Sequence, residues 1–455
     1  MPYIYNTPQD QQDMLEAIGV SSIEDLFDQI PPEVRLDRPL DLAPAHSEME
    51  LSQHLAGLAS QNLHTANSVC FLGGGSYDHF VPAVVDAIAS RGEFYTSYTP
   101  YQPEVSQGNL QVMFEYQTLI CQLTGMDVSN ASLYDGGNAA AEAVLMAMSA
   151  TKRTGKVVVP ASVHPEYRQI LETYLTSLNT ELVTVPAGEG AAALAALEAA
   201  VDEDTACVLV QHPNFFGAVE QTEDIAHIAH QKGALLIVAF DPISLGLLKR
   251  PGDCGADIAV AEGQSLGTPM QYGGPYLGIM ACREKFVRRL PGRIGGETVD
   301  RRGRRCWVLT LQTREQHIRR EKATSNICTN QGLFALRAAI YLATLGPQGL
   351  RETAELCVQK ANYARQQITQ LDRFSDAFSL PAFKEFVVRD HNNQVGPMLQ
   401  DAAEQGILAG IPLQKWYPNL SDCFLVTVTE QRTKQQIEAL TNCLANAQQP
   451  TAIHA

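Results

Sequence analysis

The sequence predicts an α/β fold in which a mostly parallel sheet lies between layers of helices. From about residue 67, short runs rich in β-branched residues alternate with helical segments, as in a series of β-α-β units. The strand-like runs are apolar throughout, which is typical of parallel strands buried on both faces. A length of 455 residues fits two packed domains and a terminal arm.

Residues 1–66 are expected to form the arm, which carries no catalytic group. Helices are predicted over residues 11–18 and 22–29, each of which begins with polar residues. Pro31 and Pro32 then interrupt the helical pattern.

A large domain is predicted over residues 67–330. Its strands are expected over residues 156–159, 207–211, 235–240, 258–261, 276–281 and 307–311. Helices are expected between them, over residues 139–150 and 222–232, and the second starts with Thr222 and two acidic residues, a typical helix N-terminus. The alanine-rich residues 188–201 are also predicted to be helical.

A smaller α+β domain is predicted over residues 331–455. Its expected elements are helices over residues 331–345, 350–371, 395–404 and 433–444, and strands over residues 383–388 and 424–428. The helical and apolar patterns of this region show no internal repeat.

The composition excludes several classes of function. A net charge of −17 argues against nucleic acid or an anionic membrane as a general partner. No run reaches the roughly 18 apolar residues that span a bilayer, and the first ten residues lack the pattern of a signal peptide. The ten cysteines include no C-x-x-C pair, so we expect no metal site and reduced thiols in the cytoplasm.

Three features occur in the order expected of a pyridoxal-phosphate (PLP) enzyme of fold type I. Gly136, Gly137 and Asn138 lead into a helix, whose free N–H groups attract phosphate, although an ordinary turn is the alternative. His164 follows one predicted strand, where such enzymes stack a ring on the cofactor. Asp241 follows another strand, where they place the carboxylate that pairs with the ring nitrogen.

The lysine that binds PLP covalently in such enzymes is missing from its expected place. It normally follows the aspartate by roughly 20 to 30 residues. Here no lysine lies between Lys249 and Lys285, and Ser265 stands near the expected position. The pocket is therefore interpreted as vestigial, and an empty or collapsed pocket is favoured over non-covalent binding of PLP or phosphate.

Four longer motifs carry a family resemblance. They are FYTSYTPYQPEVSQG at residues 94–108, SLYDG at 132–136, AEGQSLG at 261–267 and RREKATSNICT at 319–329. The sequence resembles the glycine dehydrogenase (decarboxylating) family, the P-protein of the glycine cleavage system, over nearly its whole length. The likeness is to the N-terminal half or separate first subunit of these proteins.

The resemblance implies an oxidoreductase of glycine catabolism that is inactive alone. Together with a partner subunit, it would decarboxylate glycine, release CO₂ and pass the aminomethyl group to the lipoyl arm of H-protein. PLP would be held covalently by the lysine-bearing second subunit and not by this chain. Two copies of each subunit are implied.

Because fold-type I dimers build each active site from both protomers, this chain is expected to supply groups to the partner's site. The candidates lie in two segments: Tyr95, Tyr98, Tyr101 and Gln102 in the first, and Arg320, Thr324, Ser325 and Asn326 in the second. The alternatives are aromatic anchors of the subunit interface for the first segment and a solvated basic patch for the second.

The basic residues 301–305 are a further candidate, for docking acidic H-protein, or else they form a solvated loop. A non-catalytic scaffold that stabilises the partner is the alternative function. An independent enzyme such as a cysteine desulfurase or an aminotransferase is disfavoured by the missing lysine.

Overall fold

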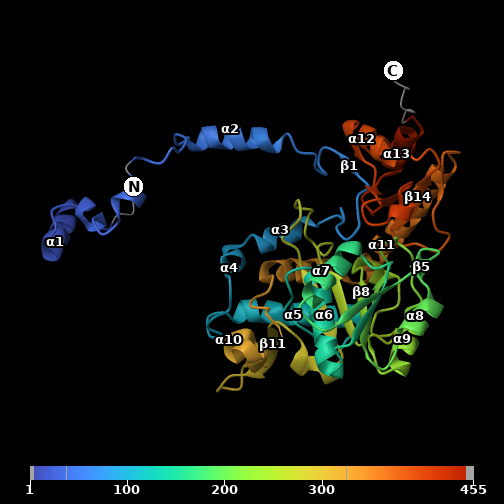
Figure 1. The fold of residues 1–455 in the computed structure, drawn as a ribbon, viewed down its shortest axis with the longest axis horizontal. Coiled ribbons are helices and arrows are strands. Elements are labelled where there is room, and N and C mark those ends of the chain that lie inside the picture. The colour runs from blue at the N-terminus through green and yellow to red at the C-terminus, as the bar shows by residue number, and fades with distance from the viewer. Residues whose placement is uncertain (1–4, 37, 324, 447–455) are drawn as a thin grey trace. The chain divides into compact units, whose positions relative to one another are not determined.

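The computed structural model describes residues 5–36, 38–323 and 325–446, and the chain divides into two units (Figure 1). The first, here called the arm unit, extends to Asn62. Its elements are α1 (Pro8–Ile18), the 3-10 helices η1 (Glu24–Phe27) and η2 (Pro32–Val34), and α2 (Glu48–Ala59).

Local hydrogen bonds define the helix ends of the arm unit. Thr7 and Ser47 precede α1 and α2, and each forms a capping box with an acidic residue three positions later. None of the described side chains in the four elements is buried. The helix predicted over residues 22–29 is too long, because Asp25 binds the backbone N–H groups of Ser21 and Ser22 and only η1 is helical.

The second unit, from Leu63 onward, is built on a seven-stranded sheet. Its strands, in spatial order, are β2 (Val128–Ser129), β10 (Gly278–Cys282), β9 (Ile258–Glu262), β8 (Leu235–Phe240), β7 (Thr205–His212), β3 (Lys156–Pro160) and β4 (Glu181–Val185). The strands from β9 to β4 are parallel, which confirms the mostly parallel sheet.

Strand β10 runs antiparallel to β9 and β2, so its interpretation as one more parallel strand is wrong. No helix connects β9 to β10 in the described chain, and without a crossover the chain returns in the opposite direction. The strand predicted over residues 307–311 also lies outside the large sheet. It forms β12 (Arg305–Thr310), which pairs with β11 (Ile294–Val299) as a separate hairpin.

Helices cover both faces of the large sheet (Figure 1). Those that pack in the two cores are α3 (Ala83–Ala89), α5 (Gln107–Thr124), α6 (Gly136–Thr151), α7 (Pro165–Leu175), α8 (Leu194–Ala200) and α9 (Thr222–Gln231), with the 3-10 turns η3 (Ile243–Gly246) and η4 (Glu284–Arg289). The short elements α4 (Gly92–Tyr95), η5 (Gln312–Arg314), α10 (Gln316–Arg319) and η6 (Arg320–Lys322) contribute no described residue to either core. Val157 and Val159 of β3 join the core beside α6 and α7, whereas Val158 joins the core beside α5 and α9.

The helix predicted over residues 188–201 is wrong in its first half. Only α8 is helical, and the preceding residues form a small hairpin of β5 (Ala187–Gly188) and β6 (Ala191–Ala192). Glu189 and Gly190 adopt positive φ angles of 47° and 86° at the turn, which a right-handed helix excludes.

The C-terminal part combines a long helix with a four-stranded antiparallel sheet. Its elements are α11 (Gly332–Thr369), β13 (Phe374–Asp376), β14 (Glu385–Asp390), α12 (Val395–Glu404), β15 (Ile407–Leu408), β16 (Ile411–Pro412), η7 (Pro418–Leu420), β17 (Cys423–Thr427) and α13 (Lys434–Asn446). Gly346, with φ 60° and ψ −174°, breaks α11 where the sequence predicts the end of one helix and the start of another.

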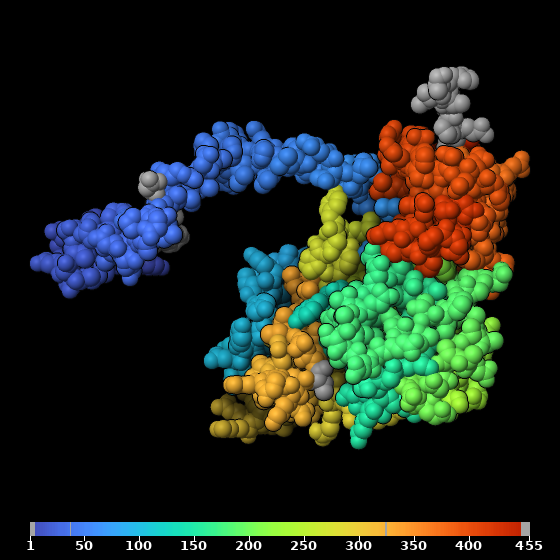
Figure 2. Space-filling view, viewed as in Figure 1, coloured from blue at the N-terminus to red at the C-terminus, as the bar shows by residue number. Residues whose placement is uncertain are grey.

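The C-terminal part, orange to red in Figure 2, packs on the green residues of the large sheet domain. Two backbone contacts fix this packing next to β14. Ala218 bridges to Ala382, and the N–H of Phe383 donates to the carbonyl oxygen of Gly217. The first strand, β1 (Val69–Cys70), adds to the same region by pairing with β15. Among the described residues, no helix combines the length and apolarity needed to cross a membrane.

Candidate functional site

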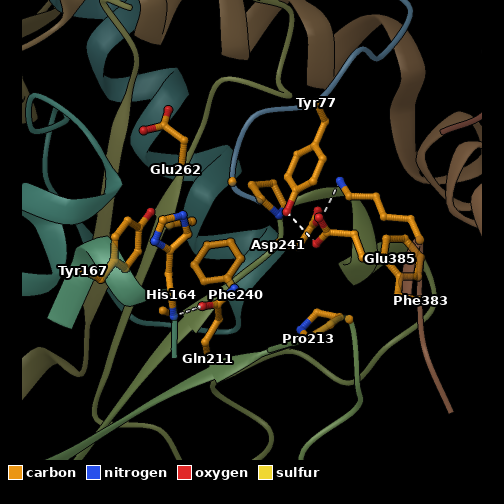
Figure 3. A pocket seen from close by; sticks show the side chains of 16 residues that line it. Tyr77, His164, Tyr167, Gln211, Pro213, Phe240, Asp241, Glu262, Phe383 and Glu385 are labelled. Atoms are coloured by element: carbon orange, nitrogen blue, oxygen red, sulfur yellow. Dashed lines mark hydrogen bonds and ion pairs between the residues drawn. The ribbon is translucent and has the colours of Figure 1, made fainter. Parts of the chain in front are cut away.

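A pocket lies at the carboxyl ends of the parallel strands, where open α/β sheets place their ligands (Figure 3). We call it the central pocket. Its polar lining residues are Tyr77, His164, Tyr167, Gln211, Asp241, Glu262, Lys384 and Glu385. The free volume within it is about 40 Å³, which is room for a few water molecules.

The two glycines that begin α6 lie beside this pocket, and two N–H groups at this helix end, those of Gly136 and Asn138, already have partners. The N–H of Gly136 donates to Oε2 of Glu262 at 2.9 Å. Asp135 caps the helix, since its Oδ1 accepts from the N–H of Asn138 at 2.7 Å. The hydroxyl of Tyr167 lies so close to Gly136 that a Cβ there would come within 2.1 Å of it. Gly136 is therefore required by close packing.

Glu262, the last residue of β9, is held by three backbone donors. Its Oε1 accepts from the N–H groups of Gln264 at 2.9 Å and Leu277 at 3.0 Å, and its Oε2 accepts from Gly136. Burial raises the pKa of Glu262 to about 7, although these N–H groups act in the opposite direction. Both carboxylate oxygens are occupied within the chain.

His164 lies at the end of β3 and is fixed from three sides. Its Nε2 is 2.6 Å from the carbonyl oxygen of Gly74 and its Nδ1 accepts from the N–H of Glu166 at 3.1 Å, so the ring is neutral with its proton on Nε2. The ring stacks on Tyr167 with a centroid distance of 4.9 Å and meets Phe215 edge-on. Burial lowers the pKa of His164.

Asp241 follows β8, as predicted, and forms an ion pair with a lysine that sequence reasoning missed. Nζ of Lys384 lies 2.6 Å from Oδ2 of Asp241, while Oδ1 accepts from the N–H of Ile243. Lys384 is 1% exposed, and its Nζ also contacts Nε2 of His79 at 2.9 Å and lies 3.4 Å from the centre of the Tyr77 ring. The ammonium group is thus enclosed by the protein.

Glu385, next to Lys384, was also missed. Its carboxylate accepts from the N–H of Gly74 at 2.7 Å, the hydroxyl of Tyr77 at 2.9 Å and the hydroxyl of Thr427 at 3.0 Å. Burial raises the pKa of Glu385 and of Tyr77. No local sequence signal marks Lys384 and Glu385 as pocket residues, because their partners lie far away in the chain.

Ser265 lies on the turn after β9, as predicted, and is buried. Its hydroxyl has no hydrogen-bond partner among the described residues. One lysine of the described chain, Lys384, lines the central pocket. It comes from the C-terminal part, not from the turn after β9, and it forms an ion pair with Asp241. The residues present therefore do not fit PLP. There is no free lysine on this turn, the N–H groups of Gly136 and Asn138 are already used, and the Asp241 carboxylate is already paired.

A second cavity brings together parts of the two motif segments. We call it the tyrosine groove, and its volume is about 370 Å³. Its lining residues are Tyr98, Thr99, Pro100, Tyr101, Arg293, Ile294, Leu309, Thr310, Gln312, Glu315, His317, Cys328 and Thr329. Arg293 joins the two segments, since its Nη1 contacts Oγ1 of Thr99 at 3.3 Å and Oδ1 of Asn330 at 3.2 Å.

The other predicted partner contacts lie outside the lining of this groove. Tyr95, Gln102, Arg320 and Asn326 are exposed. Ser325 is half-buried and its hydroxyl accepts from the N–H of Ile327. Thr324 lies outside the described residues. Sequence reasoning missed Arg293, Glu315 and His317, which reach the groove only through the β11–β12 hairpin and the turns after it.

Of the basic segment at residues 301–305, residues 301–304 form the turn of the β11–β12 hairpin and Arg305 begins β12. Asp300 organises this turn by accepting from the N–H groups of Arg302 and Arg304. Arg304 pairs with Asp300 and Arg305 with Glu297, and the side chains of Arg301 and Arg302 are exposed.

Comparisons with known proteins agree over nearly the whole chain. Residues 1–444 match the family described as glycine cleavage system P-protein. The probable glycine dehydrogenase (decarboxylating) subunit 1 of Carboxydothermus hydrogenoformans is 52% identical over 444 residues, covering 98% of this chain and 99% of the relative. The protein of the same description from Desulforamulus reducens is 51% identical over 442 residues, covering 97% and 98%.

Solved structures show the same relationship. A glycine decarboxylase (P-protein) of the glycine cleavage system, crystallised in inhibitor-bound form, is 44% identical with a TM-score of 0.89, covering 98% of this chain and all of that one. The sphingosine-1-phosphate lyase of Burkholderia pseudomallei is 15% identical with a TM-score of 0.67, covering 90% and 92%, and shares the fold alone. The predicted fold, that of the fold-type I PLP-dependent proteins, is confirmed.

Proposed function

Because this chain belongs to the glycine cleavage system P-protein family, we propose that it is the subunit of a glycine dehydrogenase (decarboxylating) that acts only with a lysine-bearing partner. The partner would hold PLP covalently, in an assembly with two copies of each subunit. Together the subunits would release CO₂ from glycine and pass the aminomethyl group to lipoylated H-protein.

One observation carries this division of labour. The turn after β9 presents Ser265, buried and without a hydrogen-bond partner among the described residues, where a PLP enzyme of this fold needs a lysine. A hydroxyl cannot replace the amine that holds PLP covalently. The chemistry that PLP supplies, a sink for the electrons left by decarboxylation, would therefore belong to the partner's site.

The tyrosine groove is the part of this chain that we assign to the partner's active site. Tyr98 and Tyr101 are 74% and 78% exposed, and exposed aromatic clusters are typical of interaction surfaces. The same groove contains the guanidinium of Arg293 and the ring of His317, which suit a carboxylate such as that of glycine. An apolar, partly basic cavity of this size would orient a small acid against groups of the partner.

The hairpin turn at residues 301–305 is the surface that we assign to H-protein. Arg301 and Arg302 project from a protein of net charge −17, so they form a local basic site on an acidic surface. Such a site would attract an acidic carrier and orient it during the encounter.

The test is glycine-dependent CO₂ exchange with lipoylated H-protein and PLP, measured for this chain alone, its partner alone and the mixture. Exchange that requires the mixture supports the proposal, and exchange by this chain alone contradicts it. If mixtures containing the Tyr98→Phe variant assemble and turn over as fast as the wild type, this chain is a non-catalytic scaffold instead.

A further inference from the structure

We propose that the central pocket is a self-liganded site, in which Glu262 and Lys384 take the places of the phosphate and the ring nitrogen of PLP. The chain would then exclude the cofactor by filling its anchors, in addition to lacking the lysine. This inference concerns the pocket of this chain alone and does not depend on the reaction proposed above.

The anion end of the pocket is occupied by a carboxylate. In PLP enzymes of this fold the N-terminus of the helix equivalent to α6 holds the phosphate through free backbone N–H groups. Here the N–H of Gly136 donates to Glu262 at 2.9 Å and that of Asn138 donates to Asp135 at 2.7 Å. An entering phosphate would find these two donors used and would face the carboxylates of Glu262 and Asp135, which repel it.

The part of the pocket that would receive the ring nitrogen, next to Asp241, is occupied by the ammonium group of Lys384. The carboxylate after β8 normally pairs with the protonated ring nitrogen of PLP. In this chain Nζ of Lys384 lies 2.6 Å from Asp241, and the lysine is 1% exposed. A ring nitrogen could reach Asp241 only by displacing this lysine and leaving its charge unpaired in the interior.

The two replacements also connect distant parts of the fold. Glu385 begins β14 of the C-terminal part, whereas Asp241 follows β8 (Figure 3). Lys384 directly precedes β14, and Gly74 follows β1. The ion pair between Lys384 and Asp241 therefore fastens the C-terminal part onto the large sheet, and the bonds from Gly74 and Tyr77 to Glu385 fasten the segment after β1 to β14. In cofactor-binding members of the fold, part of this space belongs to PLP.

The experiment measures gain of binding in the isolated full-length chain. The probe is pyridoxine 5′-phosphate, which has no aldehyde and so cannot react with surface lysines, with pyridoxine as the control lacking phosphate. Calorimetric titration compares the wild type with the Glu262→Ala/Lys384→Ala variant. A Glu223→Ala/Lys249→Ala variant serves as the matched control, because that ion pair has the same chemistry at 2.7 Å but is exposed.

We expect no detectable binding of pyridoxine 5′-phosphate by the wild type or the control variant. The Glu262→Ala/Lys384→Ala variant should bind it at least tenfold more tightly than the detection limit of the titration, and should not bind pyridoxine. Binding by the wild type that is lost on substitution of His164, or a folded double variant that gains nothing, would overturn the proposal.

A second measurement keeps the test decisive if the double variant does not fold. The single Glu262→Ala variant retains the Lys384–Asp241 pair, and inorganic phosphate should then raise its melting temperature but not that of the wild type. An equal shift for both proteins contradicts the assignment of Glu262.

Discussion

Nζ of Lys384 lies 2.6 Å from Oδ2 of Asp241, and both side chains are almost completely enclosed by the protein. The two residues are 143 positions apart and come from different parts of the second unit. This pair neutralises, inside the chain, the carboxylate that would otherwise attract a ring nitrogen.

Replacing Lys384 by Met should destabilise the chain by about 3 to 5 kcal/mol, because it leaves the Asp241 carboxylate buried without its partner. The double variant Lys384→Met/Asp241→Asn should recover much of this loss. Lys249→Met, at an exposed pair with Glu223, should change the free energy of unfolding by less than about 1 kcal/mol. Urea unfolding of all three variants checks the prediction, and equal losses for Lys384→Met and Lys249→Met would contradict it.

The wild type should lose stability relative to a Glu262→Gln variant as the pH rises from about 4.5 to about 7. Burial raises the pKa of Glu262 to about 7 from an ordinary 4.5, so the folded chain keeps a proton that the unfolded chain has released. The stability that this proton contributes is complete below about pH 4.5 and is lost as the pH rises through about 7.

At about 1.4 kcal/mol per pH unit, the Glu262 effect is at most about 3 to 4 kcal/mol. Chemical unfolding of both proteins at several pH values measures it, and the Gln variant cancels the contributions of all other titrating groups. A difference between the two proteins that stays constant with pH would show that Glu262 does not titrate in this range.

Arg293→Ala should lower glycine turnover of the assembled enzyme by about tenfold or more while leaving assembly intact. The guanidinium group holds Thr99 and Asn330 together, and without it the two walls of the tyrosine groove lose their shared anchor. The measurement is the kcat and KM of CO₂ exchange, with gel filtration to verify assembly. Arg288→Ala is the control, because Arg288 is exposed and lies outside the groove lining. The same loss of turnover in both variants would contradict a role of the tyrosine groove in turnover.

Tyr98→Phe should reduce turnover at unchanged complex stability, because it removes one hydroxyl from the groove and keeps the aromatic surface. Tyr272→Phe provides the comparison, since Tyr272 is similarly exposed, at 76% against 74%, but lies outside the groove lining. If assembly weakens and turnover per assembled complex stays the same, Tyr98 acts as an interface anchor.

Reversing the charge of Arg301 and Arg302 to Glu should raise the KM for H-protein without changing kcat, and added salt should shrink the difference from the wild type. The double substitution Lys249→Glu/Lys434→Glu, at two exposed lysines, changes the net charge by the same amount and serves as the control. Titration of H-protein at low and moderate ionic strength makes the measurement, and equal effects at both sites would remove the hairpin turn from consideration.

The positions of five of the seven strands of the large sheet, and the ligand edge of the sheet, were predictable because they depend on local pattern, whereas the edge strands β2 and β4 were missed. Strands β8 and β9 read as apolar runs, and His164 and Asp241 follow strands as the fold requires. The direction of β10 was not predictable from its apolar character, because it is set by a connection without a helix.

The filling of the central pocket was not predictable from the sequence either. Glu262 belongs to a recognised motif, yet its bond to Gly136 joins residues 126 positions apart. A lysine before an apolar strand ordinarily reads as a solvated residue, and only the tertiary contact with Asp241 shows that Lys384 is buried.

The arm unit has a thermodynamic consequence for the isolated chain. Its helices α1 and α2 have 11 and 12 residues, and none of their side chains is buried. Helices of this length are marginal in water without tertiary packing. Because their side chains are already exposed, the melting of α1 and α2 exposes little additional apolar surface. The heat-capacity change on unfolding should therefore fall short of the value expected for 455 residues, and the calorimetric peak of the isolated chain should report the second unit.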